Sequence, residues 1–200
     1  MAVDIHQMIT NLLEFFDLTN KTIISVGAGG GQFIEYGCNA NKVFAIDCDE
    51  SALEMLRENL INAGLTNKFT LIHSDFYHAV QKGDVVIFEL SLHELSDPAL
   101  AVRHALTLAP NVLVLDHWVS SDWVYFIDEK EKVTRSWAAL EAFDFKKFQQ
   151  YDTFEFFGDY EELYEKIKGQ GETSISRIEK FKDKKQFTIP LSYALALISK

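Results

Sequence analysis

The stretch TIISVGAGGGQ, residues 22–32, decides the fold of this chain. A short run of β-branched apolar residues passes directly into glycines at alternate positions, Gly27, Gly29 and Gly31. A loop of this kind lets a ligand approach the backbone, because glycine has no Cβ and tolerates positive φ. We therefore predict a strand over 22–26, a short helix from about Gln32, and a nucleoside cofactor bound at the loop between them.

The same rhythm continues on the C-terminal side of this loop. Short apolar runs alternate with helical patterns as far as residue 116, which is typical of βαβ units around a parallel sheet. Runs of this kind are buried on both faces of a sheet, so helices should cover both. We predict further strands at 43–46, 69–73, 85–90 and 112–115, helices at 50–63 and from 97 to about 110, and a short helix at 78–81.

The two flanks of this region differ from it. Apolar residues at helical spacing over 5–16 predict an amphipathic helix, so residues 1–20 are expected to form a leading helical cover. Residues 118–164 hold 14 of the 26 aromatic residues. We expect 118–170 to be a helical insertion, either a lid over an acceptor pocket or an outer layer packed on the sheet. Residues 174–181 and 191–199 are expected to form an antiparallel strand pair, with 180–185 as its turn.

Composition limits the architecture and the partners. A chain of 200 residues that is 48% hydrophobic is expected to form one domain over 1–200. Its formal charge of -11 repels phosphate backbones, so DNA is not expected as a partner. The N-terminus lacks a signal-peptide pattern, and no apolar stretch approaches a membrane span, so we expect a cytoplasmic protein with no membrane partner. Cys38 and Cys48 are too few for a disulfide framework or a zinc knuckle.

Two positions bear on the class of cofactor. The nicotinamide dinucleotide pattern G-x-G-x-x-G or A would require Gly or Ala at position 32, where this chain has Gln32. Asp47, which follows the second predicted strand, lies 20 residues beyond Gly27, where a carboxylate can accept hydrogen bonds from ribose hydroxyls. These residues favour a nucleoside cofactor other than NAD.

The segments ISVGAGGGQF, VFAIDCD, HSDF and VVIFELSLHEL resemble successive motifs of the class I S-adenosylmethionine-dependent methyltransferases, in the expected order over residues 22–116. The resemblance implies a Rossmann-like, doubly wound α/β fold with a mostly parallel seven-stranded sheet. It also implies an antiparallel last strand, for which residues 193–198 are the candidate. It implies that the cofactor is S-adenosylmethionine.

The resemblance also implies roles for individual residues. The glycine loop would face the methionine part of the cofactor, Asp47 and its neighbour Cys48 the ribose, and Asp75 with Phe76 the adenine. Glu89 and Leu90 would line the methionine and acceptor side. The cofactor-binding residues implied are Gly27, Gly29, Gly31, Asp47, Cys48, Asp75, Phe76, Glu89 and Leu90.

Several of these positions have structural alternatives. Asp47 is also consistent with an ordinary strand-terminal acid, and Asp75 with an N-cap of the short helix that follows. Glu89 is also consistent with a structural hydrogen bond to the backbone. The chain departs from the family pattern at Ser25, where an acid is common, and serine cannot balance the ammonium charge of the cofactor.

Histidines supply the candidates for proton transfer. His93 and His117 follow the fourth and fifth predicted strands, so both are expected where the carboxyl ends of the strands meet. Imidazole suits a general base near neutral pH, which makes these two the catalytic candidates. No histidine pair has i, i+4 helical spacing and none clusters with cysteines, so no metal site is predicted.

The sequence therefore predicts methyl transfer from S-adenosylmethionine to a small-molecule acceptor that is partly aromatic or apolar. A non-catalytic S-adenosylmethionine-binding regulatory protein is the first alternative, and a nicotinamide-dependent oxidoreductase the second. An N/D-P-P-Y/F motif, which enzymes that methylate nucleic-acid amino groups carry, is absent after the fourth predicted strand. The oligomeric state stays open, with a homodimer as one alternative.

Overall fold

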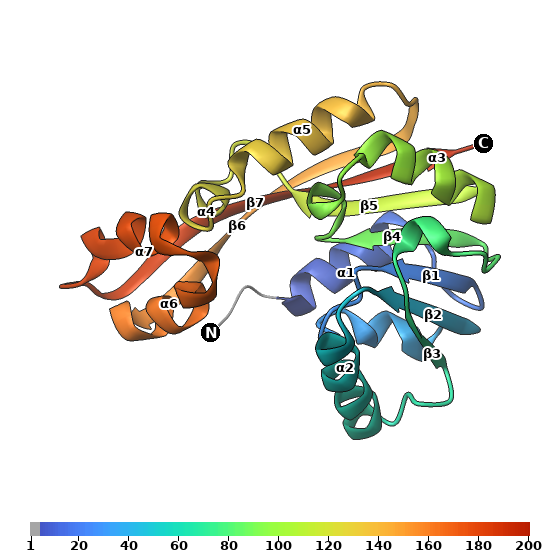
Figure 1. The fold of residues 1–200 in the computed structure, drawn as a ribbon, viewed down its shortest axis with the longest axis horizontal. Helices are drawn as coiled ribbons and strands as arrows, with labels where there is room; N and C mark the ends of the chain where they lie inside the picture. Colours follow the sequence, from blue (N-terminus) through green and yellow to red (C-terminus); the bar gives the residue numbers. More distant parts are fainter. Residues whose placement is uncertain (1–4) are drawn as a thin grey trace.

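A seven-stranded sheet forms the centre of the molecule in the computed structural model, which describes residues 5–200 (Figure 1). The strand order is β3-β2-β1-β4-β5-β7-β6, parallel from β3 to β5, with β7 antiparallel to both of its neighbours. The strands are β1 (Thr22–Val26), β2 (Lys42–Asp47), β3 (Phe69–His73), β4 (Val85–Glu89), β5 (Asn111–His117), β6 (Phe145–Asp159) and β7 (Lys185–Ser199). The doubly wound prediction is confirmed, and the order reverses between β1 and β4, where such folds form a crevice.

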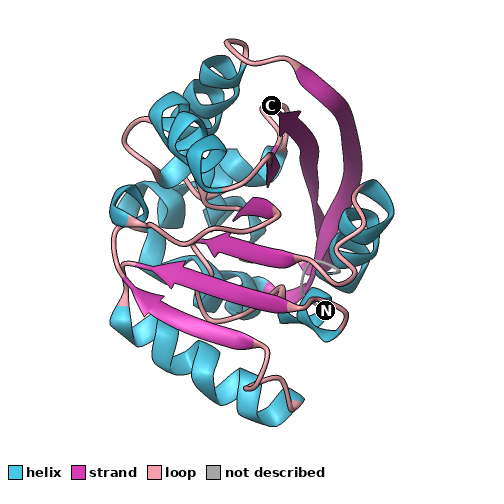
Figure 2. Cartoon of the chain, turned by 90° about the vertical axis from the view of Figure 1, so that its right-hand side faces the viewer, coloured by secondary structure: helices cyan, strands magenta, loops and turns pink. Residues whose placement is uncertain are grey.

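Helices cover both faces of the sheet (Figure 2). On one face, side chains at odd-numbered positions of β1 and β4, such as Ile23 and Ile87, pack against α1 (Ile5–Phe15) and the 3₁₀ helix η1 (Ile34–Cys38). The helix α2 (Glu50–Ala63) covers β2 on the same face. Even positions, such as Ile24 and Phe88, pack against α3 (Pro98–Leu108) and α5 (Lys130–Leu140) on the other face. All five residues of β4 are buried, as expected for a central parallel strand.

Local sequence signals set the helix ends as predicted. Asp49 caps α2 by accepting from the Ser51 N–H, and Gly64 ends the helix in a left-handed conformation with φ 69°. Asp97 caps α3, with Pro98 in its first turn. The predicted short helix at 78–81 lies slightly earlier, as the 3₁₀ helix η2 (Phe76–His78). The helix predicted from Gln32 begins later, as η1.

The C-terminal part departs from the predictions. Residues 118–170 contain α4 (Asp122–Phe126), α5 and α6 (Tyr160–Ile167), but also the 15-residue strand β6, which was expected to be helical. Residues 174–181 were predicted as a strand but are helical. They belong to α7 (Glu172–Ile178) and to the 3₁₀ helix η5 (Glu179–Phe181) that follows it. The 3₁₀ helix η4 (Lys168–Gln170) precedes α7. Ile175, Ile178 and Phe181 are three residues apart, which places them on one helix face. The partner of β7 at the sheet edge is therefore β6.

The β6–β7 pair extends beyond the other strands, and α6 and α7 lie around its far end (Figure 1). Phe157 of β6 and Leu191 of β7 join the same core as Leu163 and Ile178 of these helices. None of the helices in the described part of the chain is long and apolar enough to span a membrane. The long pair brings α6 toward the carboxyl ends of the parallel strands.

Candidate functional site

Two cavities adjoin each other at the carboxyl ends of the parallel strands. The first cavity, of about 460 Å³, is lined by Val26, Gly27, Ile46, Asp47, Cys48, Ser74, Asp75, Phe76, Tyr77, Leu90, Ser91, Glu94, Leu95 and Ser96. The second cavity, of about 530 Å³, is lined by Ile5, Met8, Gln32, Leu90, His93, Glu94, His117, Trp123, Ile127, Glu129, Lys166, Gln170 and Leu191. Leu90 and Glu94 line both, so the two spaces lie side by side at these residues.

The glycine loop meets β4 through a close contact that the sequence did not reveal. Gly27 has φ 68°, and a Cβ on it would lie 2.3 Å from the Cβ of Ser91. The Ser91 hydroxyl in turn donates to the Val26 carbonyl at 2.6 Å. Gly29 and Gly31 also have positive φ, but neither lines the first cavity. At Gly27 the lack of a side chain therefore serves the packing of the loop on β4.

Asp47 lies at the end of β2 and lines the first cavity. Its Oδ2 accepts from the Gly29 N–H at 2.8 Å, and its Oδ1 accepts from the Asp49 N–H at 2.9 Å. Each carboxylate oxygen has a second lone pair, so the group can still accept from a ligand hydroxyl. The carboxylate thus holds the glycine loop and is itself held in one orientation.

Asp75 and Phe76 both line the first cavity, where each also has a structural role. Asp75 Oδ1 accepts from the Tyr77 N–H at 2.9 Å, which is the N-cap alternative considered above. Phe76 is buried and makes edge contacts with Phe88 and His104, so most of its ring belongs to the core. The neighbouring Tyr77, which was not predicted, also lines the cavity and is less buried.

Glu89 at the end of β4 lines neither cavity. Its carboxylate accepts a short hydrogen bond from the Tyr36 hydroxyl, and both side chains are buried. Burial raises the pKa of Glu89 to about 7, although hydroxyl groups nearby, first that of Tyr36, act in the opposite direction. Glu89 belongs to the layer beneath the glycine loop, next to the buried Ser25.

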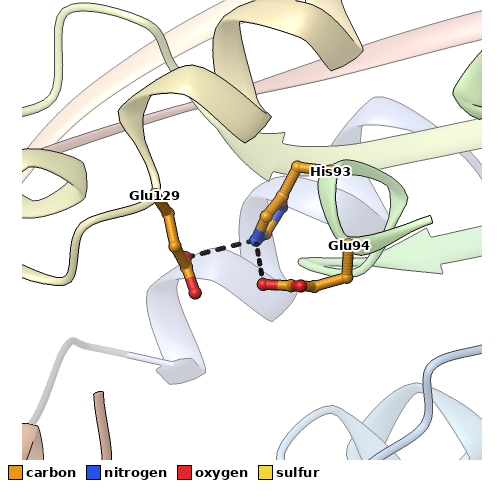
Figure 3. Close-up of side chains that lie close together, drawn as sticks. All are labelled: His93, Glu94 and Glu129. Atoms are coloured by element: carbon orange, nitrogen blue, oxygen red, sulfur yellow. Dashed lines mark ion pairs between the residues drawn. The ribbon is translucent and has the colours of Figure 1, made fainter. Parts of the chain in front are cut away.

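His93 is a buried side chain that lies between three carboxylates, two of them buried and that of Glu94 exposed. Its Nδ1 is 2.6 Å from Asp116 Oδ1, and its Nε2 is 3.2 Å from Glu129 Oε2 and 3.4 Å from Glu94 Oε1 (Figure 3). Burial lowers the pKa of His93, but the hydrogen bonds to Asp116, Glu129 and Glu94 together raise it to about 11. At neutral pH and without a ligand, His93 is therefore a cation and has no free lone pair for a proton.

His117 lines the second cavity and differs from His93 in its protonation state. Burial lowers the pKa of His117 to about 4, so its imidazole is neutral at pH 7. Its backbone N–H donates to Asp116 Oδ1 at 2.8 Å, and its carbonyl accepts from Trp137 Nε1 at 2.6 Å. Its Nδ1 is buried and has no hydrogen-bond partner among residues 5–200. A ligand in the second cavity could therefore use this imidazole.

The walls of the second cavity come from segments far apart in the chain. Ile5 and Met8 of α1 form one side, so the leading helix lines a site as well as covering the sheet. Trp123 of α4 and Leu191 of β7 form another. Trp137, by contrast, is buried against the sheet, so the aromatic segment supplies both a cavity wall and an outer layer.

Sequence reasoning missed several residues that line these cavities or lie beneath the glycine loop. Ser91 and Tyr36 had no signal in the sequence, because their partners lie 65 and 53 residues away in the chain. Glu94 could have been noticed as the neighbour of His93. Glu129 could not, because it follows a segment with no strand or glycine pattern.

Comparison by sequence matches less than half of this chain. The family model described as "Methyltransferase domain" matches residues 24–111. The tRNA (guanine(37)-N(1))-methyltransferase Trm5b of Methanocaldococcus jannaschii is 34% identical over 85 residues, which are 42% of this chain and 25% of that protein. The chain spans about a quarter of the length of the curated relatives that it matches.

Solved structures match over nearly the whole chain. A SAM-dependent methyltransferase from Aquifex aeolicus has a TM-score of 0.63 at 17% identity, covering 98% of this chain and 89% of that one. Magnesium protoporphyrin IX methyltransferase from Synechocystis, with bound SAH (S-adenosylhomocysteine), has a TM-score of 0.61 at 12% identity, covering 98% and 81%. At these identities the likeness concerns the fold, and it includes the C-terminal strands that the family model does not reach.

Proposed function

We propose that this chain, a member of the class I S-adenosylmethionine-dependent methyltransferase family, transfers the methyl group of S-adenosylmethionine from the first cavity to a small-molecule acceptor in the second. The observation that carries the proposal is the pair of adjoining cavities with Leu90 and Glu94 as their shared wall. Methyl transfer needs the acceptor atom in direct contact with the methyl group, so the proposal requires the two spaces to open into each other beside these shared residues.

The first cavity fits the nucleoside part of the cofactor. Its volume lies within the range of about 300–1,000 Å³ usual for small-molecule sites. Asp47 supplies an oriented carboxylate for the ribose hydroxyls and Asp75 one for the adenine amino group, while Val26 and Ile46 offer apolar surface. When bound, S-adenosylmethionine supplies an electrophilic methyl group on a sulfonium.

Leu90 lies where the proposed donor and acceptor spaces meet. It is a non-glycine residue with φ 53°, a conformation that costs free energy and is found at functional sites when the surroundings enforce it. Its N–H donates to the Leu115 carbonyl at 2.8 Å, which fixes the turn at the end of β4. We assign to Leu90 the alignment of the acceptor against the methyl group and the exclusion of water between them.

The second cavity fits an acceptor with an apolar or aromatic body and a polar reacting end. Met8, Trp123 and Leu191 supply the apolar walls, and His93 and His117 lie at the polar end. Of the two histidines, His117 is the better candidate to interact with the acceptor, because both ring nitrogens of His93 already face carboxylates. His93 instead holds Glu94 and Glu129 in place.

A small acceptor is favoured over RNA, although a curated relative acts on tRNA. The match to that relative covers only 42% of this chain. The net charge of -11 opposes binding of a phosphate backbone. The second cavity carries both signs of charge, with Glu94 and Glu129 against His93 and Lys166, so its lining is not a phosphate-binding surface of uniform positive charge.

The test is a calorimetric titration of the purified protein with S-adenosylmethionine, S-adenosylhomocysteine and NAD, followed by a screen of small aromatic and apolar acceptors by mass spectrometry. We expect binding of both sulfur nucleosides, no response to NAD, and a product heavier by one methylene unit. Cofactor binding with no product from any acceptor class would instead support the regulatory alternative. Binding of NAD alone would overturn the proposal.

A further inference from the structure

We infer that His93, Glu94 and Glu129 form a binding site for one divalent transition-metal ion, of the Mn²⁺ or Zn²⁺ type, at the polar end of the second cavity (Figure 3). The spacing among histidines and cysteines in the sequence predicted no metal site, and carboxylates were not part of that prediction. The fold brings one imidazole and two carboxylates together instead, from η3 (Leu92–Glu94) and from the residue before α5.

The spacing of the three side chains suits metal ligation. His93 Nε2 lies 3.4 Å from Glu94 Oε1 and 3.2 Å from Glu129 Oε2, and the three ligand atoms all lie within 4.8 Å of one another. Ligands at about 2.1 Å from a shared ion are roughly 3.0 Å apart in octahedral geometry and roughly 3.4 Å apart in tetrahedral geometry. The two measured distances fall in this interval, so an ion could bind after small shifts.

The outer hydrogen bonds of His93 are those of a metal ligand. Its Nδ1 faces Asp116 Oδ1 at 2.6 Å, and a carboxylate on that nitrogen leaves Nε2 as the atom that binds a metal. Asp116 Oδ2 also accepts from the His93 N–H at 3.1 Å. Arg135 of α5 donates to the His93 and Leu95 carbonyls, which holds α5, and with it Glu129, against η3.

A second feature indicates that a ligand belongs in this space. His117 lines the same cavity, its ring centroid lies 5.8 Å from that of His93, and its buried Nδ1 has no partner among the described residues. Buried polar atoms are rarely left without a partner unless water, an ion or a substrate supplies one. Three protein ligands also leave coordination positions open toward the cavity, as catalytic metal sites do.

Two features oppose the ion. His93 is a cation in the ligand-free protein, so an ion must first displace the Nε2 proton that faces Glu94 and Glu129. Lys132 Nζ lies 2.9 Å and 2.8 Å from the two carboxylate oxygens of Glu94, so an ion must compete with an ammonium group for this ligand. The side chain of Lys132 is 43% exposed and can move into solvent. Removing this ammonium should therefore strengthen metal binding, whereas removing either carboxylate should weaken it.

If the proposed methyl transfer also holds, an ion here would contact the acceptor directly. A bound divalent ion lowers the pKa of an oxygen or nitrogen group that it coordinates, which would favour the nucleophilic form of the acceptor. The metal site itself does not depend on that use.

The test is titration of the chelator-treated protein with MnCl₂ and separately with ZnCl₂, followed by calorimetry and, for Mn²⁺, by loss of the free-ion electron paramagnetic resonance signal. We expect one ion per chain for at least one metal. Glu94→Gln and Glu129→Gln should each weaken binding at least about 10-fold, since a charged ligand is lost. Lys132→Gln should tighten binding several-fold.

Glu131→Gln is the matched control, because Glu131 is an exposed carboxylate two residues from Glu129, and it should leave the affinity within about 2-fold. Circular dichroism of each variant checks its fold, and Glu94→Gln keeps the test informative if Glu129→Gln unfolds. Binding of neither ion, or binding unchanged in a folded carboxylate variant, would overturn the inference. No cofactor is present in these titrations, so failure to bind S-adenosylmethionine would count against the methyltransferase proposal alone.

Discussion

The two cavities differ in how the chain builds them. The first is formed by residues at and just after the carboxyl ends of β1 to β4, all within residues 26–96. The second is formed by side chains from both ends of the chain, from Ile5 to Leu191. A site built from consecutive loops carries its motifs in the sequence, whereas a site built from distant side chains exists only after folding.

The largest expected effect concerns the first cavity. Asp47→Ala removes a carboxylate that we assign to two ribose hydroxyls, and hydrogen bonds to charged groups contribute about 1.5–3 kcal/mol each. We therefore expect at least about 100-fold weaker S-adenosylmethionine binding, measured by calorimetry. Glu54→Ala, on the exposed side of α2, is the control and should leave the affinity unchanged. A folded Asp47→Ala protein with wild-type affinity would break the assignment of this cavity.

The next prediction compares the loss of stability on substituting two glycines that share a backbone conformation. Gly27→Ala should destabilise the protein by about 2–4 kcal/mol, because positive φ and the 2.3 Å approach to Ser91 act together. Gly64 has φ 69° but open space around it, so Gly64→Ala should cost only about 1–2 kcal/mol. Urea unfolding measures both. Equal losses would mean that the loop does not depend on its contact with β4.

A third prediction concerns the layer beneath the glycine loop. Because the pKa of Glu89 is raised to about 7 in the folded state, the folded protein binds more protons than the unfolded chain between about pH 4.5 and 7. This contribution to stability is present below pH 4.5 and is lost as the pH rises through 7. Glu89→Gln should therefore gain stability relative to wild type from pH 5 to pH 8, by up to about 3 kcal/mol.

Urea unfolding at several pH values measures this difference. Glu58→Gln, on the exposed face of α2, should show none of it. A difference between Glu89→Gln and wild type that stays constant with pH would show that Glu89 does not titrate in this range.

The smallest expected effect tests whether the two cavities act separately. Gln170 lines the second cavity from the exposed η4 and is remote from the glycine loop in the sequence. Gln170→Ala should leave S-adenosylmethionine affinity within about 2-fold, because Gln170 lines only the second cavity and residues that share no contacts behave nearly additively. A larger change in calorimetry would show that the shared wall transmits changes between the cavities.

The sequence predicted the first half of the fold for identifiable reasons. β4 is apolar except for Glu89, β1 is mainly β-branched, and Gly64 and Pro98 mark helix ends by their own backbone preferences. β6 could not be recognised in this way, because its first six residues are exposed and polar residues fall on both of its faces. An edge strand with little burial shows no alternating pattern, and its aromatic residues were assigned to a helical segment.

For the site as for the fold, the sequence predicted one part better than the other. Six predicted cofactor residues line the first cavity, which are Gly27, Asp47, Cys48, Asp75, Phe76 and Leu90. Glu89 turns away toward Tyr36, because the side chain at the end of β4 faces the layer under α1 and η1. The two predicted histidines do meet at the second cavity. Their surroundings could not be predicted, since Glu129 reaches His93 only through the packing of α5 on η3.

The place of β7 in the sheet has a consequence for folding during synthesis of the protein. β7 follows every other strand in the chain, yet it lies between β5 and β6 and contributes Leu191 to the second cavity. During synthesis on the ribosome, the first cavity can form while β5 still has an unpaired edge, which is a surface prone to aggregation. The nascent chain therefore keeps an unpaired edge on β5 until β7 emerges, and the second cavity is completed at the same step.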